Sequence, residues 1–137
     1  MTTQISVKPN VLDKVQQPKP KAHAWLKVCK QNDLVINSGV CVLVENKQIA
    51  IFSVNDANKP EAICLYASDN YDPIGKANVI SRGILCSIGE EMAICSPLYK
   101  QHFSLIDGRC FEQNDVTLNI YAAKIEGEDV SLFVPLL

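Results

Sequence analysis

The sequence predicts an all-β protein. Its apolar runs are short, rich in β-branched and aromatic residues, and bounded by Gly, Pro, Asn or Asp. Several runs are separated by only two or three polar residues, a spacing that is typical of β-hairpins. No segment keeps a helical period for more than one turn, near residues 31–36 or 73–78. We therefore expect an antiparallel β-sandwich or partly open barrel that carries one long, loop-rich insert.

The first half of the chain predicts four strands. After a short apolar run at residues 25–29, runs at 40–45 and 48–54 flank Asn46-Lys47, which we interpret as a hairpin turn. The turn-forming cluster NDANKP then precedes a fourth run at residues 61–67. The stretch SDNYDPIGKANVISRG that follows is too long and irregular for a simple connection. Long loops in compact domains are often functional, so we expect this one to carry part of a site.

The second half predicts further hairpins. ILCSI and EMAIC pair through Gly89-Glu90, and a second loop follows at residues 96–101. HFSLI then leads into an Asp107-Gly108 turn and RCFE. Finally, TLNIYAAKIE and VSLFVPL pair around the turn Gly127-Glu128-Asp129. Because only one hairpin separates the two long loops, we expect their tips to meet at one end of the fold.

A length of 137 residues suits one folded domain, which we place at residues 23–137. Residues 1–22 are polar and include PKPK, so we interpret them as a flexible leader. The net charge of −2 is unevenly distributed, because residues 1–30 carry six lysines and one acid. The remaining chain carries seven basic and fourteen acidic groups, and this acidic body disfavours nucleic acid as a partner.

Membrane insertion and secretion are not expected. No apolar run approaches the ~20 residues of a membrane helix, and the N-terminus has no apolar signal core. We therefore expect a cytoplasmic protein, in a compartment where disulfides are rare. The six cysteines form no C-x-x-C pair and mostly have apolar neighbours, so we interpret them as small buried apolar residues: Cys29, Cys41, Cys64, Cys86, Cys95 and Cys110.

The residues themselves point to no catalytic or metal centre. Cys95 and His102 share one region and Asp72 could orient the histidine, but nothing in the sequence forces the contacts that a nucleophilic thiol needs. With two histidines in the chain, a two-histidine metal site is hardly feasible. Of the two arginines, Arg82 and Arg109, we expect one to brace a loop internally.

The plan of two loops around one hairpin resembles a Rieske domain. Cluster-bearing members carry C-x-H in the first loop and C-P-x-H-G in the second, followed by a phenylalanine strand and a D-G turn. Here the ligand positions hold four other residues, with Pro97 retained and Lys100 in place of the glycine: Asn70, Asp72, Ser96 and Tyr99. The resemblance thus implies a Rieske-like β fold with a loop-rich tip, and no metal or cofactor on this chain.

DNYDPIGKANVISRG followed by ICSPLYKQHFSLIDGRCFE is more specifically similar to the small subunit of the cytoplasmic NAD(P)H-dependent nitrite reductase. The early W-x-x-V-C and I-A-I-F also match, so the resemblance covers about residues 25–135. It implies an accessory subunit without a redox or catalytic centre of its own. Its partner would be a large subunit that carries FAD, an iron–sulfur cluster and sirohaem, and that reduces nitrite to ammonium with NAD(P)H.

In that role the two loops would form a rigid docking tip. The expected contact residues supply hydrogen bonds, charge and aromatic anchors: Asn70, Tyr71, Asp72, Arg82, Leu98, Tyr99, Lys100, Gln101 and His102. Alternatively, Tyr71 and Tyr99 fill the space that a cluster would occupy. Two other functions stay open from the sequence, a Rieske-type [2Fe-2S] ferredoxin and a stand-alone β-domain that binds a ligand.

Overall fold

The computed structural model describes residues 22–56, 58–59 and 61–136. The 1–22 leader predicted above therefore lies outside the described residues, apart from Ala22. The described chain is built from strands and two single 3-10 turns, η1 (Gln31–Asp33) and η2 (Ile80–Arg82). The strands are β1 (His23–Lys30), β2 (Ser38–Val44), β3 (Lys47–Asn55), β4 (Ile63–Asp69), β5 (Tyr71–Asp72), β6 (Ala77–Asn78), β7 (Ile84–Ile88), β8 (Glu91–Cys95), β9 (His102–Ser104), β10 (Ile120–Glu126) and β11 (Asp129–Pro135).

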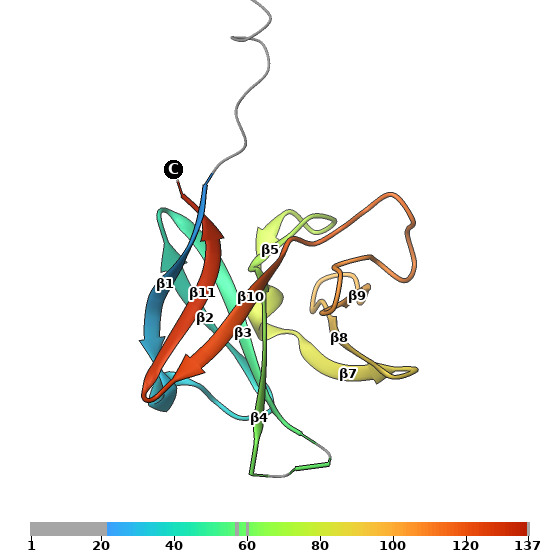
Figure 1. Cartoon of the computed structure of the whole chain (residues 1–137). Coiled ribbons are helices and arrows are strands. Elements are labelled where there is room, and N and C mark those ends of the chain that lie inside the picture. The colour runs from blue at the N-terminus through green and yellow to red at the C-terminus, as the bar shows by residue number, and fades with distance from the viewer. Residues whose placement is uncertain (1–21, 57, 60, 137) are drawn as a thin grey trace, which may run out of the picture.

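Six strands form one antiparallel sheet in the order β1-β11-β10-β4-β3-β2. Figure 1 shows this sheet curled into a half-barrel, with the short β5 and the β7-β8-β9 sheet beside its open side. The predicted all-β fold is confirmed, and of the two predicted architectures the partly open barrel describes it. Within the described part of the chain, no helix has the length and apolar character that crossing a membrane requires.

The hairpins follow the turn residues of the sequence, with two differences. The β7–β8 hairpin turns at Gly89-Glu90 as predicted, whereas the β10–β11 turn is Gly127-Glu128 alone, because Asp129 already pairs with Glu126. The β2–β3 turn lies one residue earlier than the predicted Asn46-Lys47, because Lys47 already pairs with Val44. Its two turn residues, Glu45 and Asn46, have φ angles of 47° and 69°. Positive φ at both positions is typical of a type I′ hairpin turn.

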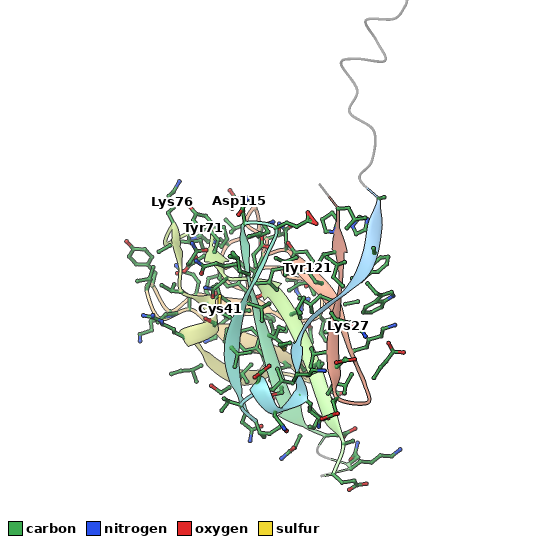
Figure 2. All side chains as sticks on the ribbon, turned by 90° about the vertical axis from the view of Figure 1, so that its left-hand side faces the viewer. Lys27, Cys41, Tyr71, Lys76, Asp115 and Tyr121 are labelled. Carbon is green, nitrogen blue, oxygen red and sulfur yellow. The ribbon has the colours of Figure 1, made fainter. Side chains whose placement is uncertain are left out.

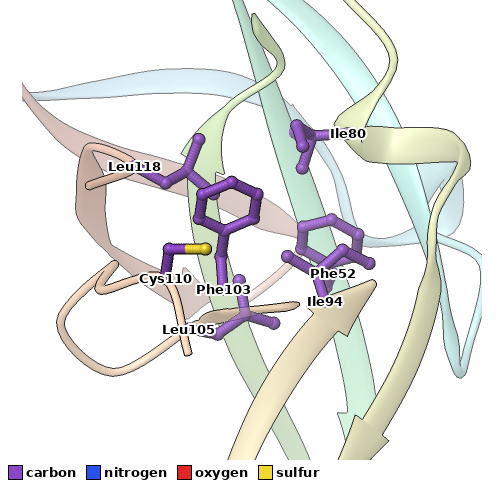
Figure 3. Close-up of a cluster of buried hydrophobic side chains, with 8 residues drawn as sticks. Phe52, Ile80, Ile94, Phe103, Leu105, Cys110 and Leu118 are labelled. Carbon is purple, nitrogen blue, oxygen red and sulfur yellow. The ribbon is translucent and has the colours of Figure 1, made fainter. Parts of the chain in front are cut away.

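Two apolar cores hold the sheets together. One fills the inside of the curled six-stranded sheet and includes Ile49, Val130 and Leu132. The other lies between that sheet and the β7-β8-β9 sheet and includes Phe52 of β3 and Phe103 of β9. Figure 3 shows this second cluster, in which the two phenylalanines lie among aliphatic side chains. The second core fixes the β7–β8 hairpin, and with it the loop that follows β8, against β3 and β4.

The cysteines are less buried than the sequence suggested. Cys110 is buried in the second core, whereas Cys41 is exposed and the other four are half-buried. All six are free thiols. The prediction that they behave as small core residues is therefore wrong for Cys41, which lies on edge strand β2 of the six-stranded sheet.

Candidate functional site

The two long loops meet, as the sequence predicted, and we call residues 70–82 and 96–102 together the tip. Their link is at the base, where the Ser96 hydroxyl donates a short hydrogen bond to Asp72 Oδ2. Asp72 Oδ1 accepts from the backbone N–H groups of Ile74 at 2.8 Å and Gly75 at 2.9 Å. Both Asp72 and Ser96 are fully buried. An Asp that caps its own loop and binds the other loop therefore fixes the two loops relative to each other.

A close apolar contact adds to this link. A methyl group built on Gly75 would lie 2.4 Å from Leu98 Cδ1, so the Leu98 side chain rests directly on the glycine. No larger residue at position 75 leaves Leu98 in place. Gly75 of the first loop thus positions the Leu98 side chain of the second. We call the exposed side chains of Tyr71, Leu98 and Tyr99 the crest of the tip.

Asn70 anchors the first loop to the six-stranded sheet. Its side-chain amide donates to Gln48 Oε1 at 2.9 Å, and its Oδ1 accepts from the backbone of Ser81 at 2.7 Å. Its own backbone N–H donates to the Gln48 carbonyl at 3.0 Å. Asn70 is 2% exposed and Asp72 is fully buried. Both side chains are buried and their polar atoms are bound inside the tip, so their role as partner contacts stays a prediction that this geometry does not favour.

The aromatic and aliphatic candidates lie on the outside of the tip. Tyr71 is 45% exposed, Leu98 43% and Tyr99 63%. Figure 2 shows Tyr71 and Lys76 at the same end of the molecule. Side chains this exposed do not fill a vacant interior, so the alternative in which Tyr71 and Tyr99 plug the tip is not supported. The Asp72–Ser96 hydrogen bond and the Leu98–Gly75 contact close the tip instead.

The second loop turns tightly between Ser96 and Gln101. The Lys100 N–H donates to the Ser96 carbonyl at 3.1 Å, and the Ser96 N–H donates to the Gln101 carbonyl at 2.9 Å. Lys100 is exposed and has a φ of 64°, in the left-handed region that favours glycine. This is the position at which the Rieske motif has glycine. Gln101 is half-buried, and its Oε1 has no hydrogen-bond partner among the described residues.

His102 is held by an acid that the sequence did not single out. Its Nδ1 lies 2.6 Å from Glu112 Oε2, and its backbone N–H donates to Glu112 Oε1 at 2.8 Å. Desolvation raises the pKa of Glu112, but these hydrogen bonds outweigh it and leave the pKa below its ordinary value. Asp72 binds Ser96, not His102, and Cys95 Sγ lies 3.6 Å from the Lys100 carbonyl oxygen. The three residues of the conceivable catalytic set therefore form no relay.

The arginines divide as expected. Arg109 braces the Asp107-Gly108 turn internally, donating to Glu91 Oε1 at 3.0 Å and to Asp107 Oδ2 at 2.7 Å. Arg82 is exposed at the end of η2. Its guanidinium has no hydrogen-bond or ion-pair partner within residues 22–56, 58–59 and 61–136. Arg82 is therefore available to a partner, and Arg109 is not.

The four positions that correspond to Rieske ligands do not fit a [2Fe-2S] cluster. Such a centre takes two thiolates and two imidazoles, whereas these positions hold an amide, a carboxylate, an aliphatic hydroxyl and a phenol. The carboxylate and the hydroxyl, Asp72 and Ser96, are bonded to each other, and Tyr99 projects outward. In the described part of the chain, no three His, Cys, Asp or Glu side chains are grouped as a metal site.

Three tip contributions were missed from the sequence. Gly75 seats Leu98, Lys76 is an exposed cation, and Glu112 holds His102. The D-P-I-G stretch carried a usable signal for the first, because an Asp three residues before a Gly is typical of a side-chain-capped turn. No comparable sequence signal indicated Glu112, because it lies ten residues from His102 and approaches it only through the folding of the 105–119 connection.

Comparison with known proteins gives a consistent result. Residues 24–133 match the model of the Rieske-like [2Fe-2S] domain family. The chain is 33% identical over 108 residues to the nitrite reductase (NADH) small subunit of Escherichia coli K12, which covers 79% of this chain and 95% of that protein. It is also 32% identical over 114 residues to the nitrite reductase [NAD(P)H] large subunit of Klebsiella oxytoca, covering 83% of this chain but 11% of that protein.

Solved structures agree. The solution structure of the E. coli protein NirD has a TM-score of 0.69 and 32% identity, covering 82% of this chain and 98% of that one. A ferredoxin of Sphingomonas yanoikuyae B1 has a TM-score of 0.60 at 20% identity, covering 82% of this chain and 100% of that one. The likeness to the ferredoxin concerns the fold alone.

Proposed function

Since this chain belongs to the Rieske-like [2Fe-2S] domain family, and within it to the small subunits of NADH nitrite reductase, we propose that it is a non-redox accessory subunit. In this role it docks to the large subunit of an assimilatory NAD(P)H-dependent nitrite reductase in the cytoplasm. The large subunit carries the flavin, the iron–sulfur cluster and the sirohaem, and converts nitrite to ammonium. The small subunit supports that reaction without a catalytic residue of its own.

The observation that carries the proposal is the near-complete match to the E. coli small subunit. The 108 matched residues span 95% of that protein, so the similarity includes both tip loops and the sheet that positions them. A shared fold alone would not license the function, because one scaffold serves many activities.

The match inside the K. oxytoca large subunit supports the choice of partner. There, a segment similar to this chain makes up 11% of a protein named as the large subunit. Domains that share one chain in one organism and are separate chains in another commonly work side by side. We therefore assign the large subunit as the partner of this chain.

The geometry of the tip supports a docking role over electron transfer. Three of the four positions that hold iron in a Rieske centre are used here for hydrogen bonds inside the protein, by Asn70 and by the Asp72–Ser96 pair. The exposed crest offers Tyr71, Leu98 and Tyr99. Aromatic side chains on a rigid, pre-formed base are typical anchors of protein interfaces.

The proposal is tested by co-purification from native cells grown on nitrate, using a tag on this chain. The large subunit should be recovered with it, and nitrite reduction by the large subunit should be higher with this chain than without it. A control variant, Leu43→Ala, changes a residue that is 69% exposed on β2 and lies outside the tip. It should recover the large subunit as the wild-type chain does. Failure to recover the large subunit, with the tagged chain folded, contradicts the proposal.

The ferredoxin alternative predicts a different result in the same preparation. A Rieske-type electron carrier would bring its own iron and would transfer electrons on its own. Replacing this chain with an iron-free preparation would then abolish its effect on the activity. Our proposal predicts that an iron-free preparation stimulates fully.

A further inference from the structure

The exposed charges of the two tip loops all have one sign. Residues 70–82 and 96–102 contain one acid, Asp72, and it is fully buried and bound to Ser96. The same loops contain three exposed cations: Lys76, Arg82 and Lys100. In the part of the chain that the structure describes, none of the three has an ion-pair partner. The two loops therefore carry three exposed cations and no exposed acid, on a chain whose net charge is −2. The exposed acids nearest to them are Glu112, which is paired with His102, and Asp115 of the 105–119 connection.

Two of the cations flank the apolar crest. Lys76 directly follows Gly75, on which Leu98 rests, and Lys100 comes two residues after Leu98. Both adopt left-handed backbone conformations, with φ of 58° and 64°. Figure 2 shows Lys76 and Tyr71 at one end of the molecule, with Asp115 of the 105–119 connection at the same end. An apolar centre with cations at its rim is the usual layout of a steered protein interface.

We propose that the tip recognises an acidic surface of the large subunit, on which carboxylates surround a pocket for Leu98 and Tyr99. This inference rests on the proposed function and adds the chemistry of the partner's face. Exposed rim charges act mainly on the rate of association, by steering the two proteins together. The acidic body of the small subunit would be repelled by the same surface, so the tip is the end that approaches it.

Nucleic acid is the less favoured occupant of the same basic tip. Binding to a nucleic-acid backbone usually needs about six to ten cations, one for each phosphate contacted, and this tip has three. The remainder of the described domain is acidic and would oppose the contact.

The test is the association of the purified small subunit with immobilised large subunit from the same cells, at about 0.03 M and about 0.5 M NaCl. Lys76→Glu and Lys100→Glu are compared with Lys59→Glu, which makes the same charge change on the exposed β3–β4 connection, away from the tip (Figure 1). Circular dichroism confirms that each variant is folded. Binding of a DNA duplex is measured in parallel.

At low salt, each tip variant should associate about threefold to tenfold more slowly than the wild type, and Lys59→Glu should stay within about twofold. The differences should shrink at high salt because the charges are screened. If the wild type binds and all three variants associate at the same rate as the wild type, this inference is overturned but the proposed function is not. DNA binding that the tip variants alone abolish, with large-subunit binding unchanged, would overturn it too. No binding of the wild type at either salt concentration contradicts the proposed function itself.

Discussion

Asp72 and Ser96 are hydrogen-bonded to each other at the buried base of the tip, although 24 residues separate them in the chain. They occupy two positions at which the Rieske motif places ligands from different loops. In a cluster-bearing domain the metal centre links the loops, and here a carboxylate and a hydroxyl link them directly. The loops can therefore keep the Rieske arrangement without iron.

Ser96→Ala should destabilise the protein by about 1–3 kcal/mol, because it leaves the buried Asp72 Oδ2 without its donor. Equilibrium unfolding in urea measures the loss. The control is Ser87→Ala on β7, where the serine is exposed and the change should stay within about 0.5 kcal/mol. Equal stabilities of the two variants would mean that the link between the loops contributes nothing.

Tyr99→Ala should weaken binding to the large subunit by about tenfold or more while leaving the melting temperature nearly unchanged. The reason is that Tyr99 is 63% exposed and therefore contributes little to the core. Calorimetric titration and a thermal melt measure the two quantities, with Leu43→Ala as the control. A lowered melting temperature with full binding would instead favour a role inside the tip.

Lys100→Gly should raise the stability of the isolated subunit by about 0.5–1 kcal/mol, because Lys100 has a φ of 64° that glycine adopts without strain. The same variant should associate more slowly with the large subunit, since it loses a tip cation. Chemical unfolding should thus show a higher free energy of unfolding, while binding kinetics should show a lower association rate. Lys59→Gly, whose residue is not in a left-handed conformation, should gain no stability.

Gly39→Ala should destabilise the protein by about 1–3 kcal/mol through overpacking. An added methyl group would lie 2.6 Å from the Ser81 carbonyl oxygen and 2.7 Å from Phe52 Cε1, so the first loop or the core has to move. Urea unfolding compares this variant with Ser38→Ala, at the exposed neighbouring position. A wild-type value for Gly39→Ala would show that β2 and η2 are not tightly packed.

Acid should destabilise the 105–112 turn region in a way that depends on Arg109. Hydrogen bonds from Arg109 hold the pKa of Glu91 below its ordinary value of about 4.3, and the pKa of Asp107 is lowered as well. A depressed folded-state pKa gives stability that is present above the unfolded-state pKa and is lost as the pH falls through the folded-state pKa. The free energy of unfolding, measured from about pH 6 to pH 3, should therefore fall less steeply for Glu91→Gln than for the wild type.

The sequence was informative where local chemistry decides the structure. Gly89-Glu90 marks a hairpin because glycine adopts the φ of 62° that the turn needs. The prediction placed the β2–β3 turn one residue too late, because Glu45 adopts a positive φ that a glutamate does not lead one to expect. The meeting of the two loops followed from their shared hairpin. In each of these cases the relevant interactions are close in the sequence.

The remaining features depend on contacts between distant residues. Asn70 and Asp72 look like surface residues in the sequence, but they are buried because Gln48, Ser81 and Ser96 satisfy their polar atoms. The burial of Cys110 and the exposure of Cys41 likewise depend on which strand lies at an edge and which faces the second core. Strand order in the sheet could not be read from local pattern, so neither could these outcomes.

The most direct test of the account is anaerobic reconstitution of the purified subunit with ferrous iron and sulfide, beside a Rieske ferredoxin treated in the same way. Iron content, visible absorption and electron paramagnetic resonance are then measured after removal of unbound metal. The account predicts that the ferredoxin acquires its cluster and that this subunit stays colourless and free of bound iron. About two irons per chain with a reducible resonance signal would contradict it.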